Sequence, residues 1–204
     1  VNGQPFIHLL IDQYIAQGFK RFIISVGYQK EKVIKSLKSR EDCTIVFCKE
    51  DEPLGTGGAI KKSKQYITSD NVIIINGDSL INLNADHLVN WHYKMKSKCT
   101  IVATEIENTR RYGTIEIDNK SRLIGFKEKG HTSLKGLVNA GIYIMNKSVF
   151  DLMPAGQTFS VELEFFPKIL RESIYAYICN EELIDIGTPD SYKKFIDNYQ
   201  KYLR

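Results

Sequence analysis

Helical and strand-like patterns alternate along the first half of the chain, and this alternation is what most restricts its fold. Apolar residues at helical spacing, bounded by Pro, Gly or polar residues, predict helices at residues 4–18, 29–39, 58–66 and 84–97. Short apolar runs between them predict strands at residues 21–26, 43–48, 71–76 and 99–106. The run "NVIIIN" at 71–76 does not alternate, which is typical of a strand buried on both faces of a parallel sheet. This succession predicts a doubly wound α/β fold.

The second half of the chain has a different pattern, with little helix at first. It predicts strands at residues 111–118, 122–129, 136–145 and 174–179, a helix at 161–172, and a last helix that begins at Pro189 after the turn at Gly187. No repeat or linker interrupts the chain. We therefore expect residues 1–204 to form a single domain with a mixed, mainly parallel central sheet flanked by helices.

Composition narrows the function classes. The chain has 204 residues, and its 43% hydrophobic and 25% charged content is that of an ordinary globular protein. Its apolar runs are too short to cross a bilayer, and its N-terminus lacks the pattern of a signal peptide. The four cysteines form no CxxC pair, which favours reduced thiols and a cytoplasmic protein over a zinc site.

The net charge of +4 is spread along the chain and does not form a block. The densest clusters, "IKKSKQY" and "YKMKSKC", are typical of solvated helix faces; nucleic-acid contact is the alternative reading. We therefore expect neither nucleic acid nor a membrane among the partners.

Two carboxylates follow apolar strands directly. Asp78 comes after residues 71–76, where Gly77 lets the backbone turn, and Asp185 ends the strand in "LIDIGTPD". In open α/β sheets ligands bind beyond such strand ends, and carboxylate oxygens suit a hard cation such as Mg²⁺. The two carboxylates could share one ion. The alternative for Asp78 is that it only caps the following turn.

A glycine-rich turn, "PLGTGGA", opens the helix expected at residues 58–66. Glycines without side chains allow a base or a phosphate to lie against the backbone, and a helix N-terminus attracts anions. The turn matches neither G-x-G-x-x-G nor G-x-x-x-x-G-K-[ST], which counts against a dinucleotide site and a P-loop. A tight turn without a ligand remains the alternative.

Further polar residues follow strands in the second half. Glu128 and Lys129 lie in "FKEKG", and Asn139 lies in "LVNAGIY". A lysine can neutralise a phosphate and an amide can bind sugar hydroxyls, although ordinary exposed polar side chains would look the same. No spacing of Ser, Cys and His indicates a nucleophile, so we do not expect covalent catalysis.

Taken in order, these segments resemble the sugar-1-phosphate nucleotidylyltransferase family. The resemblance covers essentially the whole chain through "NGQPFIHLLID", "EDEPLGTGGAI", "IINGDSL", "RYGTIEID", "GFKEKG", "GLVNAGIYIM", "FSVELEFFPKIL" and "LIDIGTPDSY". Within the family, "EPLGTGGAIK" and "IDIGTPDSYKKF" look most like the D-glycero-α-D-manno-heptose 1-phosphate guanylyltransferases. Uridylyl- and thymidylyltransferases that act on hexose 1-phosphates are the alternatives.

The resemblance implies a Rossmann-like nucleotidyltransferase fold, Mg²⁺ as cofactor, and an NTP, by this likeness GTP, and a sugar 1-phosphate as substrates. It implies that one set of residues borders the base and ribose: Leu54, Gly55, Thr56, Gly57 and Gly77. Another set would line the sugar-phosphate pocket: Tyr112, Gly113, Glu128, Lys129 and Asn139. Asp78 and Asp185 would bind Mg²⁺ and, with Lys129 on the phosphate, act in catalysis. The glycines of the turn would then make room for the nucleotide.

The sequence departs from the family pattern at its start. The family begins with a strand and a GGxGTRL loop that grips the triphosphate, whereas this sequence opens at "VNGQPF", just after that part. We expect an N-terminally incomplete domain with weak or no transferase activity, which the missing segment would restore. A natural short form, or a catalytically incompetent subunit that binds nucleotide sugars, is the alternative. An open sheet position would also allow a homo-oligomer.

Overall fold

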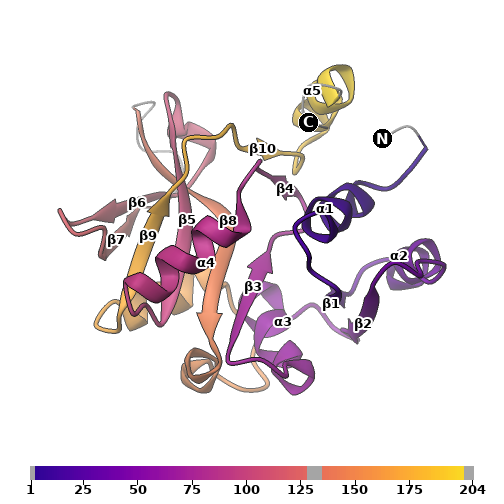
Figure 1. The fold of residues 1–204 in the computed structure, drawn as a ribbon, viewed down its shortest axis with the longest axis horizontal. Helices are drawn as coiled ribbons and strands as arrows, with labels where there is room; N and C mark the ends of the chain where they lie inside the picture. The colour runs from indigo at the N-terminus through magenta and orange to yellow at the C-terminus, as the bar shows by residue number, and fades with distance from the viewer. Residues whose placement is uncertain (1–2, 128–134, 200–204) are drawn as a thin grey trace.

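Strand β8, Gly136–Asn146, lies at the centre of the larger sheet in the computed structural model, which describes residues 3–127 and 135–199. One edge of β8 pairs antiparallel with β5, Cys99–Ile106, along most of its length. Its other edge is shared: β3, Asn71–Ile75, pairs with the C-terminal part of β8, and β6, Thr114–Ile117, meets it at Val138. Figure 1 shows β8 among these strands, with helix α4, Ala85–Lys94, lying across them.

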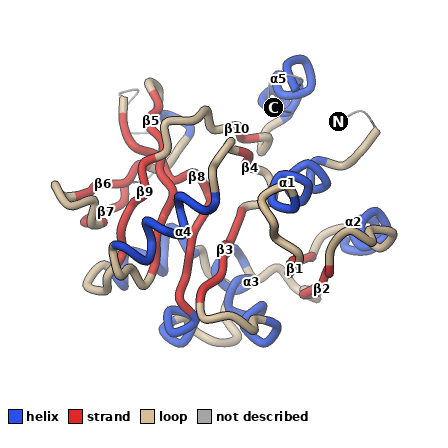
Figure 2. The backbone as a smooth tube through the Cα atoms, viewed as in Figure 1, coloured by secondary structure: helices blue, strands red, loops and turns tan. Residues whose placement is uncertain are grey.

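The remaining elements follow the expected order closely. The helices are α1 (Phe6–Ile15), α2 (Lys30–Leu37), α3 (Gly55–Ser63) and α5 (Pro189–Asn198). The strands are β1 (Arg21–Val26), β2 (Thr44–Lys49), β4 (Ser79–Leu80), β7 (Leu123–Lys127), β9 (Ile174–Ile178) and β10 (Ile184–Asp185). Figure 2 shows their distribution as red strands and blue helices. The mixed α/β class expected from the sequence is confirmed.

Helices form where the sequence provides one apolar face and suitable ends. In α1, Phe6, Leu10 and Tyr14 recur every four residues, and all three are buried. In α5, Pro189 occupies the first turn, and the Thr188 side chain accepts from the Ser191 backbone N–H in a capping box. These local signals explain why both helices begin within two residues of the predicted positions.

The strands do not form one continuous sheet. β1 and β2 pair parallel as a separate two-stranded sheet, while β4 and β10 pair antiparallel in another. The larger sheet has the order β7-β6-β8-β5-β9, with β3 beside β8. In Figure 1, β1 and β2 stand apart from β3 on the right of the view. Among the described residues no pairing joins β1 to β3.

Two expectations about this sheet were wrong in detail. β3 is only half-buried along its length and pairs antiparallel, rather than lying within a parallel sheet. Most pairings in the larger sheet are antiparallel, and β5 with β9 is its parallel pair. The reason is the direction of β8, which follows the β6–β7 hairpin and runs antiparallel to both β3 and β5. Apolar content alone does not specify which strand will pair with which.

The helix expected at residues 161–172 is also wrong. A π-helical turn at Val161–Phe165 runs into a 3₁₀ turn at Phe166–Ile169, and neither is an α-helix. Pro167 lies in the middle of this segment and cannot donate a backbone hydrogen bond, which prevents a regular α-helix. The segment still buries its apolar residues, because Val161, Phe165 and Phe166 lie in the main core.

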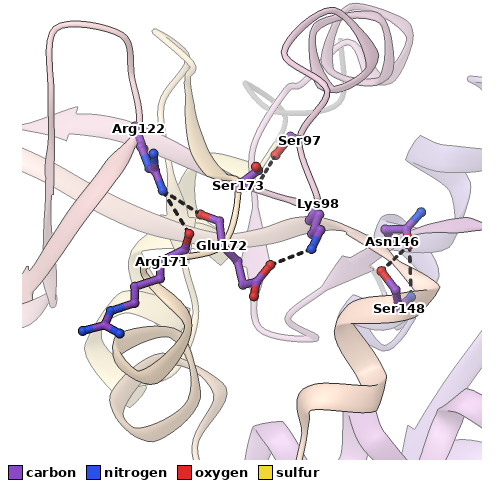
Figure 3. Close-up of polar contacts among 8 residues, drawn as sticks. All are labelled: Ser97, Lys98, Arg122, Asn146, Ser148, Arg171, Glu172 and Ser173. Atoms are coloured by element: carbon purple, nitrogen blue, oxygen red, sulfur yellow. Dashed lines mark hydrogen bonds and ion pairs between the residues drawn. The ribbon is translucent and has the colours of Figure 1, made fainter.

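Polar contacts connect the residues that precede β5, β7 and β9 (Figure 3). Lys98 pairs with Glu172 at 2.6 Å, while Arg122 donates to the backbone carbonyl of Glu172. Ser97 donates to the carbonyl of Ser173, just before β9. These contacts tie the beginnings of β5, β7 and β9 together. In the part of the chain that the structure describes, no helix has both the length and the apolar character needed to span a membrane.

Candidate active site

The two strand-end carboxylates face one small volume. Asp185 pairs with Ser79 in the β4–β10 sheet, and the Ile186 amide donates to the carbonyl of Asp78 at 2.9 Å. A methyl group built on Gly187 would lie 2.9 Å from Asp185 Oδ1 and 3.5 Å from Asp78 Oδ2. The two acids are more than a hundred residues apart in the sequence, and the short antiparallel ladder brings them together.

The carboxylate pair suits a hard cation. Ser79 Oγ donates to Asp78 Oδ1 and the Gly187 amide donates to Asp185 Oδ1, which leaves one oxygen of each acid without a hydrogen bond in the described residues. Neither acid has an ion-pair partner within residues 3–127 and 135–199. Within the same ranges no group of three or more His, Cys, Asp and Glu side chains is placed to hold a metal ion. Two carboxylates fit Mg²⁺, because Mg²⁺ commonly takes one or two carboxylates and completes its shell with water and phosphate.

Tyr112 lies close to this pair. Burial raises the pKa of Tyr112, the nearby charge of Asp185 raises it further, and Arg111 opposes both effects. Arg111 also donates to Thr188 Oγ1, at the start of α5. A tyrosine hydroxyl and an arginine therefore lie next to the two carboxylates, where a phosphorylated ligand would need donors and positive charge.

Close packing against residues 157–159 explains why the turn contains glycines. Gly55 has a φ of +68°, and a side chain there would meet the Phe159 backbone oxygen at 2.5 Å. A Cβ on Gly57 would lie 2.0 Å from the Phe159 ring, and one on Gly58 would lie 2.8 Å from the carbonyl of Gln157. These contacts with residues 157–159 require glycine for packing alone, and the expectation that the turn makes room for a nucleotide stays a prediction.

The same turn is joined to β8 through a carboxylate that the sequence analysis missed. Glu162 accepts hydrogen bonds from Thr56 Oγ1 at 2.7 Å, from Tyr143 OH at 3.0 Å and from Ser160 Oγ at 2.9 Å. The Asn139 amide donates to Tyr143 OH at 2.8 Å. One hydrogen-bond chain thus connects Thr56 with Asn139, which were expected to contact the nucleotide and the sugar phosphate respectively.

The sequence contains weak signals for this chain of hydrogen bonds between Thr56 and Asn139. Tyr143 lies four residues after Asn139 on the same strand, so both side chains project from one face. Glu162 stands in "SVELE", where three polar residues alternate with apolar ones ahead of Phe165. That alternation indicates an extended or irregular segment more than a helix.

The structure brings together some of the expected residues and leaves others aside. Leu54, Gly55, Thr56 and Gly77 all border one cavity, so the turn and the residue before Asp78 share a space. Gly113 lies near the Lys127 carbonyl, at the end of the β6–β7 hairpin. Glu128 and Lys129 lie outside the described residues.

Comparison with known proteins agrees with this arrangement. The model of a family described as nucleotidyl transferase matches residues 1–202. The chain is 37% identical over its full length to a D-glycero-α-D-manno-heptose 1-phosphate guanylyltransferase of Aneurinibacillus thermoaerophilus, and it covers 88% of that protein. It is 31% identical to the protein of the same name from Campylobacter jejuni, with 97% of this chain and 87% of that protein covered.

Solved structures agree as well. HddC from Yersinia pseudotuberculosis superposes with a TM-score of 0.87 at 34% identity, covering 97% of this chain and 86% of that one. A second structure of HddC, complexed with GMP-PN, superposes equally well at 33% identity. The family match over nearly all 204 residues, together with these relatives, shows that the chain belongs to the nucleotidyl transferase family.

Proposed function

We propose that this protein transfers a guanylyl group from GTP to D-glycero-α-D-manno-heptose 1-phosphate. The observation that carries the proposal is the similarity over the whole chain to a guanylyltransferase of that name, at 37% identity. The Campylobacter jejuni relative has the same name, and the related HddC structure contains GMP-PN, a guanine nucleotide by its printed name. Uridylyl and thymidylyl transfer have no comparable support among these relatives.

In this reaction a phosphate oxygen of the sugar 1-phosphate attacks the α-phosphorus of GTP. A new P–O bond forms, the bond from the α-phosphorus to the oxygen bridging to the β-phosphate breaks, and pyrophosphate leaves. Because two anions must meet, the protein's main contribution is charge neutralisation and in-line positioning. This demand suits a site with paired carboxylates and no protein nucleophile.

Asp78 and Asp185 would hold Mg²⁺ through the Oδ2 atom of each, because both Oδ1 atoms already accept a hydrogen bond. When bound, the ion would offset negative charge on the phosphate oxygens. Arg111 and Tyr112, next to Asp185, would orient the sugar phosphate. Lys129 would neutralise the phosphate and Glu128 would bind the sugar, although both roles rest on the family resemblance alone.

Thr56 and Asn139 would define opposite sides of the substrate pocket. Glu162 holds the Thr56 hydroxyl, and Tyr143 holds one N–H of the Asn139 amide. The second N–H of Asn139 is then available for a sugar hydroxyl. The Leu54–Gly57 backbone would lie along the base and ribose, with its conformation set by Phe159.

We also propose a cytoplasmic location, because the four cysteines are free thiols, as a reducing compartment requires. Residues 1–204 would belong to one nucleotidyltransferase domain. This last proposal rests on the family resemblance.

Pyrophosphate release across a panel of substrates tests the function. GTP, UTP, dTTP and CTP would each be combined with the heptose 1-phosphate, mannose 1-phosphate and glucose 1-phosphate, with Mg²⁺. The chain would be assayed alone and preceded by the N-terminal segment of the Aneurinibacillus relative. We expect the extended protein to release pyrophosphate fastest from GTP and the heptose 1-phosphate. Release from UTP or dTTP but not from GTP would eliminate the guanylyl assignment.

A further inference from the structure

Glu162 joins two segments that carry expected substrate contacts. Its Oε2 atom accepts hydrogen bonds from Thr56 Oγ1, in the glycine-rich turn, and from Ser160 Oγ. Its Oε1 atom accepts from Tyr143 OH on β8. The side chain is half-buried, and each of its two oxygens is used toward a different element of the fold. The carboxylate is therefore a branch point between the turn and the strand.

The π-helical turn at Val161–Phe165 holds Glu162 in this place. Val161 and Phe165, on either side of it, are buried in the main core. The Ser160 side chain accepts from the Leu163 N–H, and this cap fixes the start of the turn. π-helical turns are frequent at functional sites, where they aim particular side chains. The local structure thus directs Glu162 away from the core and toward Thr56 and Tyr143.

The branch toward β8 has a defined hydrogen-bond direction. A carboxylate only accepts, so Tyr143 donates its single proton to Glu162 and accepts from Asn139 Nδ2 at 2.8 Å. Burial, and then the charge of Glu162, raises the pKa of Tyr143 well above its usual value, so the hydroxyl keeps this proton. The Gly141 N–H donates to Asn139 Oδ1 at 2.9 Å, which agrees with the same orientation of the amide. The second N–H of Asn139 is thereby presented as a donor.

The branch toward the glycine-rich turn is equally directed. Thr56 Oγ1 accepts from the Val161 N–H at 3.0 Å and donates its proton to Glu162. Backbone bonds support this contact, because the Gly57 N–H donates to the Phe159 carbonyl and the Phe159 N–H donates to the Leu54 carbonyl. The position of the turn is therefore set from residues 159–162.

The Asn139 end of the network lies next to the candidate metal site. The Asn76 N–H donates to the carbonyl of Gly141 at 2.8 Å, and a Cβ on Gly141 would lie 2.7 Å from Asn76 Nδ2. Asn76 precedes Asp78 by two residues. The hydrogen bonds that start at Thr56 thus end beside the strand end that carries one of the two acids.

We propose that Glu162 is a positioning residue for both substrates. Through Thr56 it fixes the turn that borders the nucleotide, and through Tyr143 it orients the Asn139 amide toward the sugar phosphate. The inference rests on the proposed function, from which it takes the two substrates. Glu162 itself contacts neither of them. A change at Glu162 should therefore affect both substrates, whereas a change farther along one branch should affect only one.

Single substitutions separate the two branches. Calorimetry would measure the Kd of GTP and the Kd of the heptose 1-phosphate separately, each with Mg²⁺. Tyr143→Phe removes one hydroxyl and should weaken only the sugar phosphate, by about fivefold, which corresponds to one hydrogen bond. Thr56→Val should weaken only GTP by a similar factor. Glu162→Gln should weaken both, because its amide has one acceptor oxygen for two branches.

A matched control lies in the same turn. Glu164 accepts from the Ser160 N–H through Oε1 and contacts neither Thr56 nor Tyr143 among the hydrogen bonds of the described residues. Glu164→Gln keeps an acceptor oxygen, so both Kd values should stay as in the unmodified chain. A merely structural role for Glu162 would lower the Tm without this pattern of substrate affinities.

The free chain provides a readout that needs no substrate. Nuclear magnetic resonance of the ¹⁵N-labelled chain records the side-chain amide of Asn139, identified by its loss in Asn139→Asp. We expect Tyr143→Phe and Glu162→Gln to shift this resonance and Glu164→Gln to leave it in place. The shift in Glu162→Gln is expected because the Tyr143 proton is then no longer directed by a carboxylate.

The outcomes separate this inference from the proposed function. An unshifted Asn139 resonance in Glu162→Gln, or weakening of only one substrate in that variant, would overturn the positioning role. Equal weakening of both substrates by Tyr143→Phe would also overturn it. Should Glu162→Gln fail to fold, Tyr143→Phe and Thr56→Val still test the two branches. Binding of neither substrate by the unmodified chain would count against the proposed function, and the amide resonance would then decide the role of Glu162.

Discussion

Replacing Gly57 by alanine tests why the glycine-rich turn is rich in glycine. Its added Cβ would lie 2.0 Å from Phe159 Cε2 and 2.3 Å from Cδ2, well inside any van der Waals contact. Phe159 is 5% exposed and lies in the main core, so its ring has little space to move. Overpacking of this kind costs about 1–3 kcal/mol, and the severity of the overlap favours the upper end.

The net effect is smaller because alanine is the better helix former. Gly57 lies inside α3, where replacement of glycine gains about 1 kcal/mol. We therefore expect Gly57→Ala to lower the free energy of unfolding by about 2 kcal/mol, or the Tm by roughly 4–8 °C for a chain of this size. Urea denaturation and calorimetry would measure both quantities.

Two further variants make this test specific. Gly77→Ala is the control, because nothing lies within 4 Å of its Cβ, and its stability should change by less than about 0.5 kcal/mol. Phe159→Leu removes part of the ring, so combined with Gly57→Ala it should recover at least about 0.5 kcal/mol relative to additivity. Unchanged stability of Gly57→Ala, together with a loss of nucleotide binding, would refute the packing explanation and support the prediction that the glycine makes room for a ligand.

Three other predictions concern polar groups that are buried or half-buried. Tyr14→Phe should raise the free energy of unfolding by about 1 kcal/mol in urea denaturation, because its buried hydroxyl has no hydrogen-bond partner in the described residues; destabilisation would contradict this. Glu162→Gln should lower the free energy of unfolding by about 1–3 kcal/mol, since a single amide oxygen cannot replace both carboxylate oxygens toward Thr56 and Tyr143. A change below about 0.5 kcal/mol would count against a stabilising role of these hydrogen bonds. Burial raises the pKa of Tyr14, Tyr143 and Cys99, so the unfolded chain releases these protons first, and stability should fall as pH rises above about 9. Denaturation midpoints from pH 7 to about pH 10.5 would check this, and an unchanged midpoint would show that these groups ionise equally in both states.

Much of the fold could be predicted because its signals are local. The stripe of Phe6, Leu10 and Tyr14 and the start at Pro189 each depend on a few neighbouring residues, and both helices are found where expected. The pairing of β3 could not be predicted, because the same apolar run suits a parallel or an antiparallel neighbour. The irregular turns at residues 161–169 were missed because helical spacing was given more weight than Pro167.

In the candidate site too, some features could be predicted from the sequence and others could not. The convergence of Asp78 and Asp185 follows from a general rule about strand ends, and the structure places both beside Gly187. The packing of the glycines depends on contact with Phe159, and the position of Glu162 depends on its hydrogen bond with Thr56. No local pattern encodes contacts made across about a hundred residues of sequence.

The most direct test of the site is a titration with Mn²⁺, a paramagnetic substitute for Mg²⁺, followed by electron paramagnetic resonance in the presence of GTP. The account predicts one tight site in the unmodified chain, weakened at least about tenfold in both Asp78→Asn and Asp185→Asn. Asp86→Asn, an exposed acid in the first turn of α4, should bind as the unmodified chain does. Unaltered Mn²⁺ affinity in either of the first two variants would contradict a metal ion shared by these carboxylates.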